Sequence, residues 1–257
     1  MRYFLCLSYD GSAFCGWQIQ PSSPSVQACL EATLSRLLNR PVAVTGAGRT
    51  DTGVHAVNYV AHFDTDGVLP FEASDFIYKL NAMLPHGVAI SSVSPVPEDL
   101  HARFSARRRE YTYFIHRKKD PFVRNYSWLC GYPSLDFDAM NEACQYLLGT
   151  HDFSCFEKTG GDNKTSICTV YDAFWKPYTP SHLQVMGSGD SESYWYFRIA
   201  ADRFLRNMVR ATVGTLIEVG RGKHRPDWVK ELIATGTRGD AGESVPGHAL
   251  FLNKVEY

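Results

Sequence analysis

The sequence predicts an α+β fold, and two observations support this class. Short runs in which apolar and polar residues alternate, at 3–9, 59–63 and 110–116, have the period of half-buried strands. Longer segments between them repeat apolar residues every three to four positions, which is typical of amphipathic helices. In the first hundred residues these elements follow in the order β, α, β, β, α, β, an α+β pattern.

The helix of the first half that the sequence indicates most clearly begins after Pro24-Ser25. Its apolar face is formed by Val26, Cys29, Leu30, Leu34, Leu37 and Leu38. A second helix is predicted over 74–83, and further strands are predicted at 42–44 and 88–93. The proline-containing segment 93–99 is the best candidate for a linker, so two domains are predicted, at 1–100 and 101–257.

The second half again shows strands with packed helices. A third helix is marked by apolar residues between 137 and 148, and a long helix is predicted over 203–219. A short helix is predicted to start at 226–228 and to end at 234. Besides 110–116, strands are predicted at 167–175, 183–186, 194–200 and 250–255. A polar loop is expected at 157–164 and a turn at 187–191.

The composition excludes several classes of protein. At 257 residues, with 44% hydrophobic and 21% charged residues, the chain has the make-up of a soluble globular protein. No apolar run has the length of a membrane span, and the N-terminus reads as a strand, not as a signal peptide. Seven cysteines without a Cys-x-x-Cys pair favour reduced thiols, and hence a cytoplasmic protein. Because the net charge is −1, nucleic-acid binding requires local basic patches.

The segment Gly46-Ala-Gly-Arg-Thr-Asp-Thr-Gly-Val-His-Ala56 has the densest set of candidate functional residues. It lies between two predicted strands, and its three glycines allow positive φ and close approach to a bulky group. It is not a dinucleotide-binding fingerprint, because Asp51 occupies the third glycine position, and it lacks the Gly-Lys-Ser/Thr ending of a P-loop. Taken alone, it is also compatible with a strained turn capped by an aspartate.

Gly48-Arg-Thr-Asp-x-Gly-Val-His55 resembles the signature loop of the TruA family of tRNA pseudouridine synthases. The resemblance extends over essentially the whole chain. It includes Tyr9-Asp-Gly-x-x-Phe-x-Gly-Trp17, His101-Ala-Arg-Phe-Ser-Ala106, Tyr111-x-Tyr113, Gly149-x-His-Asp-Phe153 and Arg210-x-x-Val-Gly214. It implies two sheet-and-helix domains of pseudouridine-synthase type, with their sheets joined around a central basic cleft. One departure is Glu110, at a place where relatives often carry a basic residue.

The resemblance also assigns the catalytic residues. Asp51 matches the family nucleophile, Arg210 the arginine that pairs with it, and Tyr111 the tyrosine that stacks on the target base. A cation beside Asp51 is physically apt, because burial alone raises the pKa of a carboxyl and neutralises it. Without the resemblance, a solvated helix face for Arg210 and an ordinary core position for Tyr111 remain open. His55 is expected to be structural.

The expected RNA contacts are basic residues. Arg49, beside the nucleophile, suits a phosphate or the flipped nucleotide. The tract from Arg103 to Lys119, which contains Arg107 and Arg108, has interleaved aromatic residues and fits a phosphate-binding wall beside a stacking platform. Lys164, in the polar loop, and Arg206 are further candidates. A run of charge alone usually forms only a solvated face.

The activity that the resemblance implies is the isomerisation of uridine to pseudouridine at positions 38, 39 and 40 of tRNA. It implies no cofactor and no metal, tRNA as the partner, and a homodimer. Two alternatives remain open, a non-catalytic RNA-binding protein and another base-modifying enzyme such as a deaminase. The deaminase requires a His-x-Glu and Pro-Cys-x-x-Cys zinc set, and the sequence has neither.

Overall fold

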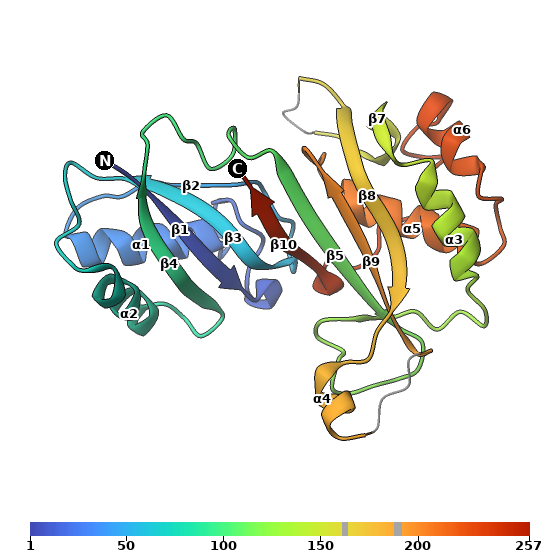
Figure 1. Cartoon of the computed structure of the whole chain (residues 1–257), viewed down its shortest axis with the longest axis horizontal. Coiled ribbons are helices and arrows are strands. Elements are labelled where there is room, and N and C mark those ends of the chain that lie inside the picture. The colour runs from blue at the N-terminus through green and yellow to red at the C-terminus, as the bar shows by residue number, and fades with distance from the viewer. Residues whose placement is uncertain (161–163, 188–191) are drawn as a thin grey trace. The chain divides into compact units, whose positions relative to one another are not determined.

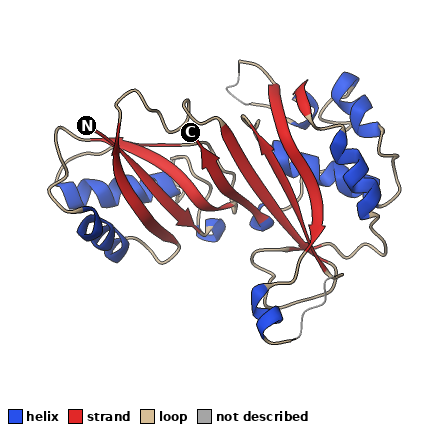
Figure 2. Cartoon of the chain, viewed as in Figure 1, coloured by secondary structure: helices blue, strands red, loops and turns tan. Residues whose placement is uncertain are grey.

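The computed structural model describes residues 1–160, 164–187 and 192–257 (Figure 1). The chain divides into two compact units. Unit 1 consists of residues 1–108 and 251–257, and unit 2 consists of residues 109–250. Each unit combines a sheet with helices (Figure 2), so the predicted α+β class is confirmed.

Unit 1 is built on an antiparallel sheet to which the end of the chain adds a parallel strand. Its strands are β1 (Arg2–Tyr9), β2 (Val44–Gly46), β3 (His55–Asp64), β4 (Val88–Val96) and β10 (Leu250–Glu256). The order is β4-β1-β3-β10, and β2 also pairs with β3. The β3–β10 pairing is parallel, with Phe251 opposite His55 and Leu252 opposite Ala56. The C-terminal strand therefore stands beside the strand that begins at the end of the signature loop.

Two helices pack together in unit 1, α1 (Val26–Leu38) and α2 (Ala73–Met83). Ser25 begins α1 as its N-cap, accepting a hydrogen bond from the amide of Ala28 at 3.3 Å, and Asn39 ends it in the left-handed conformation. Val26, Leu30 and Leu34 are fully buried, as the 3.6-residue period predicts. The helix begins and ends where the sequence predicts, because both its caps and its apolar period are local signals.

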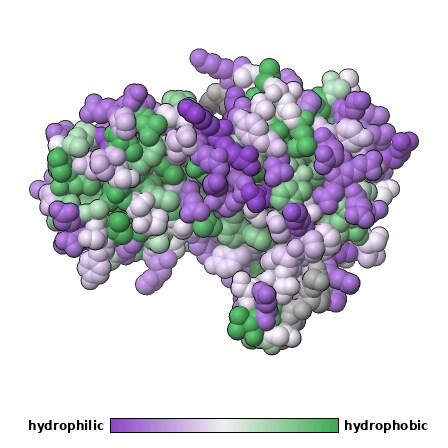
Figure 3. Space-filling model, in the orientation of Figure 1, coloured by the Kyte–Doolittle hydropathy of each residue, from purple (hydrophilic) through white to green (hydrophobic). Residues whose placement is uncertain are grey.

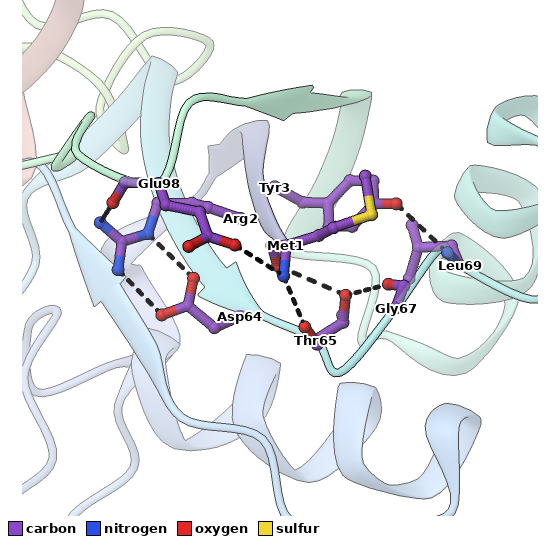
Figure 4. A network of polar contacts seen from close by, with 8 residues as sticks. All are labelled: Met1, Arg2, Tyr3, Asp64, Thr65, Gly67, Leu69 and Glu98. Carbon is purple, nitrogen blue, oxygen red and sulfur yellow. Dashed lines mark hydrogen bonds and ion pairs between the residues drawn. The ribbon is translucent and has the colours of Figure 1, made fainter.

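A network of polar contacts joins the start of β1 to the segments that follow β3 and β4 (Figure 4). Arg2 donates Nε and Nη2 to the two carboxylate oxygens of Asp64, each at 2.9 Å, and Nη1 to the carbonyl of Glu98 at 2.7 Å. The α-amino group of Met1 donates to the carbonyl of Thr65 at 2.7 Å. The hydrogen bond from Arg2 lowers the pKa of the Asp64 carboxyl. Three segments far apart in sequence are thereby tied together at one end of the sheet.

Unit 2 is also built on an antiparallel sheet. Its strands are β5 (Arg108–His116, mostly in this unit), β6 (Trp128–Leu129), β7 (Gly149–Asp152), β8 (Ile167–Pro177) and β9 (Tyr194–Ala201). The order is β5-β9-β8-β7, and β6 pairs with β5. Its helices are α3 (Phe137–Gln145), α4 (Ser181–Val185), α5 (Met208–Gly220) and α6 (Trp228–Thr235). Helix α3 packs on α5 and on β8. Three short 3-10 helices complete the described chain, at Gly11–Ala13, Ser154–Phe156 and Gly247–Ala249.

The structure corrects three of the predicted elements. The segment 183–186 is not a strand: residues 183–185 lie on helix α4 and Met186 is its C-cap, and the five residues of the helix are too few to show a helical period. The long helix begins at Met208 instead of 203, because Asn207 has the left-handed conformation with φ of 65°. The predicted linker 93–99 is a strand as far as Val96.

Two further expectations concern polar segments, and both extend beyond the described chain. The middle of the expected loop at 157–164 and most of the expected turn at 187–191 lie outside the described residues. In the part of the chain that is described, no helix is both long and apolar enough to cross a membrane.

Candidate active site

The signature loop of unit 1 runs from the end of β2 at Gly46 to the start of β3 at His55. The loop that follows β1 lies against it and is hydrogen-bonded to it along its length. The amide of Trp17 donates to the carbonyl of Thr50 at 3.2 Å, and the amide of Gly53 donates to the carbonyl of Phe14 at 3.4 Å. The backbone is thus anchored on both sides of Asp51.

Glycine is required where the two loops touch. Gly16 has φ of +94°, and a Cβ on this residue would overlap the carbonyl oxygen of Thr50. A Cβ on Gly11 would overlap the carbonyl oxygen of Val54. Backbone therefore packs directly on backbone, which leaves the aspartate loop little freedom to move.

Three aromatic side chains support the loop from beneath. The rings of Trp17 and Tyr59 stack with centroids 4.2 Å apart, and Tyr9 lies edge-on to Tyr59 at 5.5 Å. The Tyr59 hydroxyl donates to the carbonyl of Gly48, and the Tyr9 hydroxyl shares a hydrogen bond of 2.8 Å with the Thr50 hydroxyl. The two hydroxyl groups of this aromatic cluster thus bond to the loop, so that packing of the core sets the position of Asp51.

Within the loop, Asp51 and His55 have different surroundings. Asp51 is half-buried, and its carbonyl accepts a hydrogen bond from the amide of Val54 at 3.1 Å. His55 is 1% exposed, stacks on Phe251 with centroids 4.6 Å apart, and accepts a hydrogen bond at Nδ1 from the amide of Gly11 at 3.0 Å. These contacts support a structural role for His55, because its imidazole holds the loop at its junction with β3.

In unit 2, Tyr111 lies on β5, opposite Ile199 of β9. Its side chain is 8% exposed and meets the ring of Phe204 edge-on, with centroids 5.0 Å apart. Tyr113, two residues further along the same face of the strand, is fully buried, and its hydroxyl donates to the carbonyl of Pro246 at 3.0 Å. Both tyrosines therefore have fixed ring positions.

Arg210 lies in the first turn of α5 and is joined to Val245 in two ways. Its Nε donates to the carbonyl of Val245 at 2.7 Å, and the amide of Val245 donates to the carbonyl of Arg210 at 3.3 Å. Since Tyr113 is bonded to the next residue, Pro246, one short segment connects the arginine to the tyrosine strand. Burial raises the pKa of the Tyr113 phenol, and the charge of Arg210 lowers it in part.

The segment 238–246 is a feature that the sequence analysis did not single out. Arg238 donates to the carbonyl of Gly242 at 3.0 Å and to the Ser244 hydroxyl at 2.8 Å, and the Asn207 amide also donates to Ser244. A Cβ on Gly214 would overlap the carbonyl oxygen of Glu243, so the segment lies flush on α5. In the sequence, this contact is marked only by glycine at positions 214 and 242. A glycine by itself does not indicate which segment packs against it.

The predicted RNA contacts are distributed over both units. In unit 1, the side chains of Arg49 and Arg107 are exposed and Arg108 is half-buried. In unit 2, Lys164 is exposed, and the exposed Arg206 donates to the carbonyls of Thr159 and Gly160 at 3.3 and 3.4 Å. The structure thus brings Arg206 to the polar loop at 157–164.

Two further observations bear on the site's charges. Glu110, the acidic residue within the basic tract, is 3% exposed and pairs with Arg198 at 2.5 Å, so its charge is compensated inside unit 2. Among the described residues, no group of three or more His, Cys, Asp or Glu side chains is arranged to hold a metal ion.

Comparison with known proteins identifies the family. A model of the tRNA pseudouridine synthase family matches residues 5–105 and 143–257. The tRNA pseudouridine synthase A of Bacteroides fragilis is 46% identical over 256 residues, covering 100% of this chain and 96% of that protein. The proteins of the same name from Bacteroides thetaiotaomicron and Parabacteroides distasonis are each 47% identical and cover 100% of this chain, with 90% and 96% of their own lengths matched. The chain therefore belongs to the tRNA pseudouridine synthase family.

Proposed function

We propose that this protein converts uridine to pseudouridine at positions 38, 39 and 40 in the anticodon stem-loop of tRNAs, with Asp51 as the nucleophile. The reaction class follows from membership of the family, whose members are isomerases that act on uridine in tRNA. The target positions and the residue roles are our proposals.

The observation that carries the assignment of Asp51 is the construction of its loop. A nucleophile that attacks one atom of a flipped nucleotide must be held in place before the substrate arrives. Asp51 lies on a backbone that is hydrogen-bonded at Thr50 and Gly53 and supported by a stacked aromatic cluster. Such a loop is far more constrained than a surface turn needs to be.

In the proposed reaction the N1–C1′ glycosidic bond breaks, the base turns, and a C5–C1′ bond forms, while the hydrogen on C5 leaves as a proton and N1 takes up a proton. The carboxylate of Asp51 attacks the base at C6, attacks the ribose at C1′, or removes a proton from C2′. Arg210 is the proposed ion-pair partner that keeps the carboxylate charged in a desolvated site. The side chain of Tyr111 stacks on the flipped uracil.

The remaining proposed contacts are to the RNA backbone. Arg49, Arg107, Arg108, Lys164 and Arg206 bind phosphates of the tRNA. We further propose that the protein is cytoplasmic, acts as a homodimer and binds one tRNA across both subunits. Because the isomerisation has no net transfer of electrons, it needs no redox cofactor, and we propose that the protein also uses no metal.

The release of tritium from tRNA that carries [5-³H]uridine tests this function. Formation of the C5–C1′ bond must expel the label, so we expect release by the wild type and none above background by Asp51→Asn. Both proteins should bind tRNA with similar Kd. Release that does not depend on uridines at 38–40 would keep the chemistry and overturn the proposed positions. Binding without release by the folded wild type would leave only an RNA-binding protein.

A further inference from the structure

Unit 2 carries a charged surface that shares only Arg117, Lys118 and Lys119 with the basic tract predicted from Arg103 to Lys119. We call residues 117–127 and 178–187 the basic lobe. The first of these segments follows β5 directly and contains one carboxylate, Asp120, together with four cations, Arg117, Lys118, Lys119 and Arg124. This local excess of positive charge stands in a chain whose net charge is −1.

The carboxylate of the basic lobe faces inward. Asp120 is 8% exposed, and its two oxygens accept hydrogen bonds from the amide of Phe122 at 2.8 Å and from the Tyr194 hydroxyl at 2.7 Å. Burial raises the pKa of Asp120, but these hydrogen bonds, together with the charges of His116 and His182, leave the pKa below its usual range. Its anion is thus compensated internally, while Lys118, Lys119 and Arg124 are exposed.

Aromatic rings alternate with these cations along the loop. Phe122 is 72% exposed and Tyr126 is 45% exposed. The Phe122 ring meets the edge of the His182 ring, with centroids 6.2 Å apart. A Phe ring that is mostly exposed to water buries little apolar area on folding, so it adds little hydrophobic stabilisation to the folded state. Exposed aromatic residues interleaved with cations are the arrangement that binds single-stranded RNA.

The basic lobe is held by its own small core and by hydrogen bonds to β9. Val123, Leu183 and Tyr194 form a buried cluster, against which Tyr178 packs. The amide of Arg117 donates to the carbonyl of Ser193 at 2.8 Å. Figure 3 shows apolar and hydrophilic side chains together over the part of unit 2 that carries α4. The exposed side chains therefore project from a supported backbone.

The basic lobe lies at the far end of β5 from Tyr111, the residue proposed to stack on the target uridine. Tyr111 and Arg117 are separated by six residues, nearly all of them on β5, which corresponds to about 20 Å along an extended strand. We propose that the basic lobe is a second tRNA-binding surface, in which Lys119 and Arg124 contact phosphates and the ring of Phe122 stacks on an unpaired base. This inference rests on the proposed function, since it takes tRNA as the ligand.

The test is to compare wild type with the double variant Lys119→Ala/Arg124→Ala. Because the altered residues lie far from the reacting atoms, we expect Kd and KM for tRNA to rise about tenfold, with kcat within about twofold of wild type. The slope of log Kd against log salt concentration should become shallower by about 2, one for each lost phosphate contact. An unchanged kcat also shows that the variant is folded.

Lys230→Ala provides the matched control, because Lys230 is an exposed lysine on α6, in the same unit but in another element. It should behave as wild type in every measurement. If the double variant has the Kd, KM and salt slope of Lys230→Ala, the basic lobe is not an RNA contact and the inference is wrong. If wild type releases no tritium, the proposed function fails, but the Kd values still decide whether the lobe binds tRNA.

Substitutions of Phe122 separate the contribution of base stacking to tRNA binding from the contribution of charge. We expect Phe122→Ala to weaken tRNA binding about tenfold with an unchanged salt slope, and Phe122→Tyr to restore wild-type affinity because it keeps the ring. Equal affinity for all three proteins would remove the stacking contact from the proposal.

Discussion

Tyr113 connects the strand that carries Tyr111 to the segment that holds Arg210. Its hydroxyl bonds to the carbonyl of Pro246, and the neighbouring Val245 bonds to Arg210 through both backbone groups. The side chain of Tyr113 is buried, so it acts on the reaction only by positioning other groups. The hydrogen bond to Pro246 spans 133 residues of sequence.

We predict that Tyr113→Phe lowers kcat about tenfold and leaves KM for tRNA nearly unchanged. A loss of this size corresponds to about 1.4 kcal/mol of transition-state stabilisation, which a small displacement of Arg210 suffices to produce. The measurement is steady-state tritium release.

Tyr3→Phe is the control, since Tyr3 is 5% exposed and its hydroxyl accepts from the amide of Leu69, in unit 1 and away from the signature loop. Both variants should lose about 1 kcal/mol of stability. If Tyr113→Phe keeps full kcat with the same loss of stability, the link to Arg210 has no catalytic role.

His62 makes the stability of unit 1 depend on pH. Its side chain is 5% exposed, and its Nδ1 accepts a hydrogen bond from the amide of Ala102 at 3.1 Å. Burial, followed by the charges of Arg2 and His101, lowers the pKa of His62 from 6.5 to about 4, while Asp64 acts in the opposite direction. Protonation would also remove the acceptor for Ala102.

Between pH 6.5 and 4, the unfolded chain binds a proton at this histidine and the folded chain does not. The stability that His62 contributes is therefore complete above pH 6.5 and is lost as the pH falls toward 4. We predict that wild type loses about 2 kcal/mol between pH 7.5 and pH 5 through this residue.

Urea unfolding of wild type and His62→Asn at both pH values measures this effect, because asparagine offers an acceptor that does not titrate. The variant should lose about 2 kcal/mol less than wild type over the same interval. Identical losses for the two proteins would show that His62 is not the titrating group. Arg2, Asp64 and His101 are present in both proteins, so their own titration largely cancels.

Among the elements, the loop after β1 tolerates substitution least, because its backbone packs directly on the aspartate loop and fixes it. Gly16→Ala introduces a methyl group against the carbonyl of Thr50 and a side chain at a positive φ. We predict that this variant lowers kcat at least tenfold and costs about 1–3 kcal/mol of stability.

Gly67→Ala serves as the comparison, because a methyl group there has no described atom within 4 Å. It should keep wild-type kcat and stability, as measured by tritium release and thermal unfolding. Wild-type kcat for Gly16→Ala would contradict the claim that the two loops position Asp51 together.

A helix or strand could be predicted correctly where its own residues contain a cap or a clear apolar period. Helix α1 has a capping serine and a clear apolar period, so its limits were correct. The start of α5 was wrong because Asn207 adopts a left-handed conformation, and nearly the whole helix is buried, so it lacks the polar face that was expected. Strands β6 and β7 were missed because two and four residues are too few to show alternation.

The predicted catalytic residues came from a resemblance, and the interactions that position them could not be predicted. Nothing in a linear sequence indicates that Tyr113 bonds to Pro246 or that Gly214 faces Glu243. Each of these contacts depends on how helices and loops pack.

For the whole molecule, the principal difference between sequence and structure is the path of the chain. The last strand, β10, returns to unit 1 and pairs in parallel with β3 next to the signature loop. A division at one point of the sequence cannot describe such a return, and the division into domains 1–100 and 101–257 remains a prediction. Phe251, close to the C-terminus, stacks on His55 and so supports the loop that holds Asp51.

The central claim is that Asp51 of this chain converts uridines 38, 39 and 40 of tRNA to pseudouridine. Mass-spectrometric mapping of pseudouridine in unmodified tRNA, incubated with wild type or with Asp51→Asn, tests it most directly. We predict pseudouridine at those positions with wild type, none with Asp51→Asn, and equal tRNA binding by both. Pseudouridine formed at undiminished rate by Asp51→Asn, or none formed by folded, tRNA-bound wild type, would contradict it.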